Sequence, residues 1–145
     1  MSSNLEQLAT SVLLIDGFAT DRTHFADQLR GCSCEYQVIE ATNGQSGRAL
    51  YRFQRVDCVV LELALPDQSG FKLLVDLVPH PSRPHVAVIV LTHLTYRGIW
   101  ELAKQYGAYA CLVKQHTTGN DLDKVIQRAV AFVGQMPKED RYPPL

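Results

Sequence analysis

The sequence lacks an excess of charge of either sign, and it lacks long apolar runs. Among 145 residues, 14 Lys and Arg stand against 15 Asp and Glu, and the basic residues are scattered. We therefore expect no basic patch for nucleic acid. No apolar run approaches the length that crosses a bilayer, and the start, MSSNLEQLAT, has no signal-peptide pattern. A cytoplasmic protein without membrane partners is expected.

Cysteine is also scarce, and its spacing matches neither a zinc site nor a disulfide framework. Cys58 and Cys111 fall inside apolar runs, where a free thiol packs as a small hydrophobe. Cys32 and Cys34 lie two residues apart, with no second Cys/His pair at zinc spacing. We expect structural or incidental roles for all four.

What the sequence does contain is an alternation of short apolar runs with helical patterns. Several runs are apolar on consecutive residues, which is typical of parallel strands covered on both faces. Such alternation requires right-handed crossovers and predicts a doubly wound α/β domain with a five-stranded parallel sheet. The predicted strands are 11–16, 36–41, 57–63, 86–92 and 109–114. The predicted domain covers 11–134, between an N-terminal extension (1–10) and a C-terminal tail or linker stub (135–145).

Apolar spacing predicts which helical residues face the sheet, and polar residues mark the helix ends. Thr20 or Asp21 is expected to cap the first helix, Asp121 could cap the last, and Gly107 fits the end of the helix at 95–107. The residues expected to face inward are Phe25, Ala26, Leu29, Ala49, Leu50, Phe53, Ile99, Leu102, Ala103 and Tyr106.

Reactive side chains stand at the predicted strand exits, where doubly wound sheets place their working sites. The stretch VVLELALPDQSG (59–70) shows one case, because a buried-strand run ends in a carboxylate. The exit residues are Asp16, Gly17, Glu62, Thr92, His93 and Lys114. Two carboxylates, a hydroxyl and an ammonium are thereby predicted to share one edge of the sheet.

This arrangement resembles the receiver domain of two-component response regulators over about residues 11–134. The motifs that carry the resemblance are VLLIDGFATDR, DCVVLELALPDQSG with Pro66 and Gly70, VIVLTHL, and YGAYACLVK. The resemblance implies a flavodoxin-like fold with strand order 2-1-3-4-5. It also implies protein partners: a histidine kinase, an effector domain, or a second copy forming a homodimer.

The resemblance further implies roles for the strand-exit residues. An Asp at the position of Glu62 would be phosphorylated, two acidic residues at positions 16 and 17 would hold Mg²⁺, and Thr92 and Lys114 would contact the phosphoryl group. A transferred phosphoryl group needs its oxygens neutralised by a metal and an ammonium, with a hydroxyl to bond a third oxygen.

The sequence departs from this pattern at several of these positions. Gly17 has no oxygen ligand to give, and the extra methylene of Glu62 moves its carboxylate by about 1.5 Å. Misplacing a reacting atom by about 1 Å can cost on the order of a hundredfold in rate. His93 replaces a small residue, Cys111 the aromatic that switches rotamer, and Gln115 a proline. The chain is therefore interpreted as a degenerate receiver, or pseudo-receiver, that is not an enzyme.

Several alternatives remain open from the sequence. Glu62 either only pairs with Lys114 or permanently imitates the phosphorylated state. Asp16 pairs with Lys114, caps the first helix, or shares a weak Mg²⁺ site with Glu62, since Mg²⁺ often needs only one or two carboxylates from the protein. Rival functions are a phosphorelay receiver with an unusual acceptor and a small flavodoxin-like enzyme or nucleotide binder. The turn DGFATDR lacks the Gly-rich cradle that a nucleotide binder needs.

An interaction surface is also expected. Tyr96 and Trp100, four residues apart, should flank the inward stripe of the helix at 95–107. Exposed aromatic residues are favoured anchors of protein interfaces. Family receivers bind partners through the face shared by this helix, the last strand and the last helix, so we expect Tyr96 and Trp100 to contribute there.

Overall fold

The computed structural model describes residues 9–32 and 35–135. Most of the extension expected at 1–10 and of the tail expected at 135–145 lies outside these residues, as does Cys34. No helix within the described ranges has the length and hydropathy needed to span a membrane.

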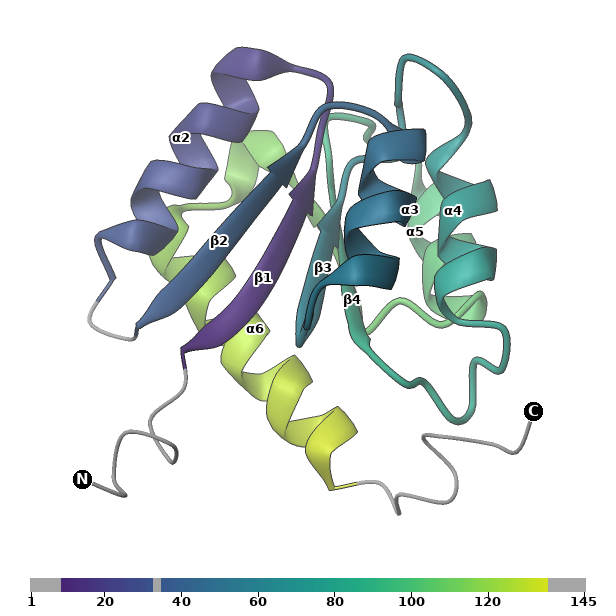
Figure 1. The fold of residues 1–145 in the computed structure, drawn as a ribbon. Coiled ribbons are helices and arrows are strands. Elements are labelled where there is room, and N and C mark those ends of the chain that lie inside the picture. The colour runs from purple at the N-terminus through teal and green to yellow at the C-terminus, as the bar shows by residue number, and fades with distance from the viewer. Residues whose placement is uncertain (1–8, 33–34, 136–145) are drawn as a thin grey trace.

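Five parallel strands form one sheet in the order β2-β1-β3-β4-β5, as predicted (Figure 1). Strand β2 has its predicted bounds, and the ends of the other strands differ from the predicted runs by at most two residues. The strands are β1 (Thr10–Ile15), β2 (Tyr36–Ala41), β3 (Cys58–Leu61), β4 (Ala87–Thr92) and β5 (Ala110–Val113).

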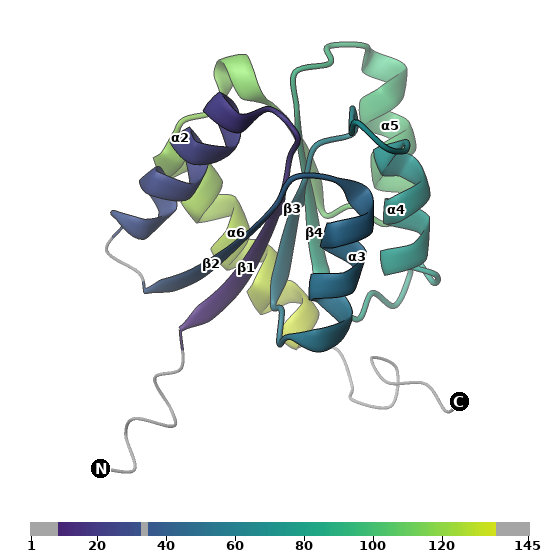
Figure 2. The same ribbon diagram turned by 45° about the horizontal axis from the view of Figure 1, so that its top comes forward.

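Helices cover both faces of the sheet, which gives the predicted three layers (Figure 2). One face is covered by α2 (Ala19–Arg30) and α6 (Gly119–Gly134). The other is covered by α3 (Gly44–Phe53), α4 (Gly70–Leu77) and α5 (Arg97–Gln105). A short 3₁₀ turn, η1 (Lys114–His116), follows β5. Consecutive residues of β1, β3 and β4 are buried because each of these strands packs against both helical layers.

The inward residues of α2 were predicted correctly. The predicted faces of α3 and α5 were right only in part, because Leu50 and Ile99 pack against the core but other residues of the two sets are exposed. Ala49 and Phe53 of α3 are exposed, Phe53 to 85%, and α3 approaches β1 most closely where Gly47 faces Ile15. A Cβ on Gly47 would lie 2.6 Å from Ile15 Cδ1, so this approach requires glycine. In α5 only Ala103 is buried, whereas Leu102 and Tyr106 are more than a third exposed.

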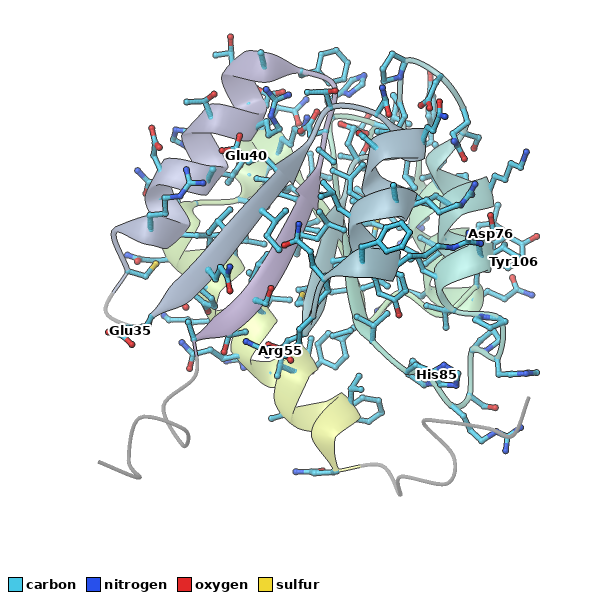
Figure 3. All side chains as sticks on the ribbon, in the orientation of Figure 1. Glu35, Glu40, Arg55, Asp76, His85 and Tyr106 are labelled. Carbon is cyan, nitrogen blue, oxygen red and sulfur yellow. The ribbon has the colours of Figure 1, made fainter. Side chains whose placement is uncertain are left out.

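Tyr106 therefore does not fill the core, contrary to expectation. Its ring contacts Phe71 of α4 edge-on, with 6.3 Å between the ring centroids. Figure 3 shows Tyr106 on the outer side of α4 and α5. The Tyr106 ring thus bridges two helices at the surface.

Two of the predicted helix caps were also wrong. Helix α2 begins at Ala19, before Thr20 and Asp21, and the amide of Phe18 donates to Asp16 Oδ1 at 2.8 Å. In α6 the cap is Thr118, and Asp121 completes a capping box from the third helical position. Gly107 has a positive φ of 108° and directly follows Tyr106, the C-cap residue of α5, so it ends this helix as predicted.

Candidate functional site

Four of the predicted residues meet in one buried centre at the carboxyl ends of the strands, which lie at the top of Figure 1. Asp16 follows β1, Glu62 follows β3, Thr92 ends β4, and Lys114 follows β5. Asp16, Glu62 and Thr92 are at most 1% exposed, and the side chain of Lys114 is 6% exposed. Parallel strands with adjacent exits place these side chains together.

The carboxylate of Glu62 accepts hydrogen bonds on both oxygens. Oε2 accepts from the Thr92 hydroxyl at 2.5 Å and from the amide of Ala64 at 2.9 Å. Oε1 lies 2.9 Å from Lys114 Nζ and accepts from the amide of His93 at 3.2 Å. The His93 ring is also near, with Nδ1 3.2 Å from Oε1. The hydroxyl, the ammonium and the two amides suffice to occupy the roughly four acceptor positions of a carboxylate.

The electrostatics of the centre follow from burial and these contacts. Burial raises the pKa of Glu62, but hydrogen bonds from Ala64, Thr92 and Lys114 outweigh it and hold that pKa below its ordinary value. Burial lowers the pKa of Lys114, yet its contacts with carboxylates more than compensate and raise that pKa. Burial dominates for Asp16, whose pKa is raised despite the neighbouring ammonium.

Lys114 is held by three carboxylates. Its Nζ lies 2.8 Å from Asp16 Oδ2, 2.9 Å from Glu62 Oε1 and 2.9 Å from Asp21 Oδ2. The expected Glu62–Lys114 ion pair is thereby confirmed. Sequence reasoning missed Asp21, which it treated only as a helix cap. The available signal was a carboxylate four residues after Gly17, in the first turn of α2.

Two aromatic rings cover the centre. Phe18 and His93 meet edge-on with 5.1 Å between ring centroids, and Lys114 Nζ lies 4.8 Å from the centroid of Phe18. The side chain of His93 is 42% exposed, whereas that of Glu62 is fully buried. His93 thus lies on the solvent side of the Glu62 carboxylate, with Phe18 packed against His93 and Lys114, and these contacts of Phe18 were not predicted from the sequence.

The residues of this centre do not fit Mg²⁺, which requires near-octahedral oxygen ligands. Gly17 offers no side-chain ligand, and the Lys114 ammonium contacts both Asp16 and Glu62. Across residues 9–32 and 35–135, no group of three or more His, Cys, Asp or Glu side chains is arranged to hold a metal. A Cβ at position 17 would also lie 2.7 Å from Pro66 Cδ, so the loop after β3 fills the space beside Gly17.

The remaining predicted residues belong to β5 and to α5 with the residue before it. Cys111 is half-buried in β5, and burial raises the pKa of its thiol to about 11. Tyr96 immediately precedes α5 and is 69% exposed. Trp100 is half-buried, and its indole Nε1 is buried without a hydrogen-bond partner among the described residues.

Comparisons with known proteins agree on one family. Residues 12–127 match the family described as "Response regulator receiver domain". The chain is similar to "Two-component response regulator-like APRR7" of Arabidopsis thaliana, with 33% identity over 105 residues, which are 71% of this chain and 14% of that protein. It is also similar to "Transcriptional regulatory protein PdtaR" of Mycobacterium tuberculosis, with 29% identity over 121 residues, which are 83% of this chain and 56% of that protein. The chain therefore spans less than two thirds of the length of either relative.

The fold is shared with solved structures of the same kind. A CheY-like response regulator receiver domain protein from Methanospirillum hungatei matches with a TM-score of 0.74 and 19% identity. The match covers 88% of this chain and 98% of that one. At this identity the likeness concerns the fold alone.

Proposed function

Because this chain belongs to the response regulator receiver domain family of two-component signalling, we propose that it is a pseudo-receiver, a signalling module that acts without being phosphorylated. Members of the family are generally not enzymes, and our proposal assigns no catalytic step to this chain. It acts by binding a protein partner through a surface, and Glu62 holds that surface permanently in one conformation.

The observation that carries the proposal is the set of contacts made by Glu62. Its carboxylate accepts a hydrogen bond from the hydroxyl of Thr92 and pairs with the ammonium of Lys114. By the family resemblance, these are the two groups that would contact the phosphoryl group. The amides of Ala64 and His93 add two further donors. We therefore favour Glu62 as a constitutive stand-in for the phosphoryl group over a mere partner of Lys114. The imitation is incomplete in charge, because a carboxylate carries −1 and a phosphoryl group about −2.

Three features support the absence of phosphoryl transfer. The residues present do not fit Mg²⁺, which would neutralise a phosphoryl oxygen in a working receiver. The Lys114 ammonium is already engaged by three carboxylates. The rings of Phe18 and His93 cover the approach to Glu62. A donor phosphorus would have to displace these groups before it reached the carboxylate.

The rival functions have less support. A phosphorelay receiver that uses Glu62 as acceptor would need that carboxylate accessible, and its side chain is fully buried. A nucleotide binder would need a phosphate cradle after β1, yet the ring of Pro66 lies against Gly17 at this turn.

We place the partner surface on α5, β5 and α6. Tyr96 presents an aromatic ring at the start of α5, with Trp100 one turn further along. A histidine kinase, an effector domain or a second copy of the chain are the partner classes that the family implies.

The test is an NMR comparison of the domain with and without Mg²⁺ and a small phosphodonor. The amide signals of Thr92, Leu94 and Lys114 should stay unchanged in the wild-type protein, whereas Glu62→Gln should shift them. Glu101→Gln, which alters an exposed carboxylate of α5, serves as the matched control. Shifts of the same three signals in the wild type that need both Mg²⁺ and the phosphodonor would contradict the proposal.

A further inference from the structure

The ammonium of Lys114 is fully coordinated by carboxylates. An ammonium has three N–H donors, and three carboxylate oxygens lie within 2.9 Å of Nζ. They belong to Asp16, Asp21 and Glu62. Nζ is therefore surrounded by carboxylate oxygens as a cation would be, at 2.8–2.9 Å, which suits an ammonium and is longer than the Mg²⁺–oxygen distance of about 2.1 Å. Because this cation is a side chain attached directly after β5, it cannot exchange with solvent.

The third carboxylate comes from an unexpected element. At the exit of β1, position 17 is glycine and supplies none. Asp21 instead reaches Lys114 from the first turn of α2, across 93 residues of sequence. Its side chain is 43% exposed and lines a cavity of about 340 Å³ beside Lys114, together with His24 and His93. Asp21 thus contacts Lys114 Nζ from the solvent side, whereas Asp16 and Glu62 contact it from the interior.

We propose that Lys114 is the resident cation of this pocket and that Asp21 is the positioning residue that holds it there. The ammonium takes the oxygens of Asp16 and Glu62 that a divalent cation would need, so the pocket does not recruit one. This inference rests on the proposed function in treating the pocket as closed to phosphoryl transfer. Its test measures cation binding, so that either idea can fail without the other.

The experiment removes the tethered cation and asks whether a free one replaces it. In Lys114→Ala three carboxylates lose their shared partner, and Mg²⁺ should then stabilise the folded protein. Titration with MgCl₂ should raise Tm by about 5 °C or more near saturation. The wild type and Lys72→Ala, which loses an exposed lysine of α4, should respond to MgCl₂ only as they respond to NaCl of equal ionic strength.

A second set of variants isolates the role of Asp21. Adding Asp21→Asn to Lys114→Ala should lower the apparent affinity for Mg²⁺ at least tenfold, whereas adding Asp21→Glu should largely preserve it. A purely structural role of Asp21 would change stability without changing this affinity. Mn²⁺ gives an independent readout, because paramagnetic broadening should reach the Glu62 and Asp16 amides in Lys114→Ala but not in the wild type.

Lys114→Gln provides a milder variant, since its amide keeps hydrogen-bond donors without the charge, and it should also gain a response to Mg²⁺. A variant that folds only with Mg²⁺ supports the proposal. Three results would overturn it: a wild type stabilised by Mg²⁺ as strongly as Lys114→Ala, folded Lys114 variants that ignore Mg²⁺, or Lys114 variants that stay unfolded at saturating Mg²⁺. If adding Asp21→Asn to Lys114→Ala left the affinity for Mg²⁺ unchanged, Asp21 would not be the positioning residue.

Discussion

The hydroxyl of Thr92 donates a hydrogen bond of 2.5 Å to Glu62 Oε2, and both side chains are buried. The two residues stand at the exits of the paired strands β3 and β4, so the backbone fixes their separation. The amide of Leu94 donates to the same hydroxyl at 3.2 Å, which directs the hydroxyl proton toward Glu62. The Glu62 carboxylate thereby uses the Thr92 hydroxyl, which by the family resemblance would bind a phosphoryl oxygen.

Removing the charge of Glu62 should destabilise the fold. In Glu62→Gln an amide group must face the donors that now point at a carboxylate, and Lys114 loses one of its three partners. We expect a loss of about 1–3 kcal/mol in the free energy of unfolding, measured by urea denaturation at pH 7. The exposed control Glu101→Gln should change it by less than about 0.5 kcal/mol. A Glu62→Gln variant as stable as the wild type would mean that the contacts of Glu62 contribute little.

The same pair of proteins should show a defined pH dependence. The pKa of Glu62 is lower in the folded protein than its ordinary value of 4.5. Its ionised form therefore stabilises the fold fully above pH 4.5, and this contribution is lost as the pH falls through the folded pKa. Burial raises the pKa of Asp16, so its contribution to the pH dependence of stability has the opposite sign. This contribution is present in both proteins and largely cancels in the difference between them. The stability difference between wild type and Glu62→Gln should shrink in acid, and a difference that widens below pH 4.5 would reverse this assignment.

Restoring phosphorylation should require more than one substitution. Glu62→Asp shortens the acceptor, and Gly17→Asp returns a carboxylate to the end of β1. Because both changes act on the same phosphoryl group, the double variant should label from a small phosphodonor far better than either single variant. Adding His93→Ala, which removes a covering ring, should improve labelling again. Equal labelling of Glu62→Asp and the double variant would show that Gly17 is not limiting.

The structure adds a cost to this restoration that the sequence did not reveal. Because a Cβ at position 17 would lie 2.7 Å from Pro66 Cδ and 3.2 Å from the Thr42 carbonyl oxygen, Gly17→Asp must displace the loop after β3. We expect Gly17→Asp alone to lower stability by about 1–3 kcal/mol. Pro66→Ala should recover part of that loss, and labelling of the double variant should rise with it.

Tyr96 offers the cleaner test of the partner surface. Trp100 is half-buried, so its removal would change both packing and binding. Tyr96 is 69% exposed, and Tyr96→Ala should weaken self-association or partner binding by at least about 1 kcal/mol while leaving Tm nearly unchanged. Association is measured by analytical ultracentrifugation or by titration with the partner. Phe53→Ala, at an exposed aromatic residue of α3, is the matched control, and equal effects of the two variants would argue against a specific surface.

The sheet and the buried centre were predictable from the sequence because they depend on order along the chain. Consecutive apolar residues mark strands buried on both faces, and parallel strands bring their exits together, so Glu62 and Lys114 had to meet. The faces of α3 and α5 were less predictable. Gly47 lets α3 approach Ile15 of β1 closely and Leu50 packs against the core, whereas Phe53 is 85% exposed.

Asp21 and Phe18 were missed for a different reason. Their roles depend on where α2 begins, and the helix starts at Ala19, before the polar residues that suggested a cap. That start directs Asp21 toward Lys114, a residue 93 positions away. The sequence shows a carboxylate four residues after Gly17, but its contact with Lys114 depends on how α2 packs against the sheet, which local patterns do not specify.

In the proposed function Glu62 replaces the phosphoryl group instead of accepting one. Intact-mass spectrometry after incubation with Mg²⁺ and a small phosphodonor tests this most directly, with Glu62→Gln treated in parallel. The mass of both proteins should stay unchanged. A stoichiometric gain of one phosphoryl group in the wild type, stable in acid, labile in base and absent from Glu62→Gln, would contradict it.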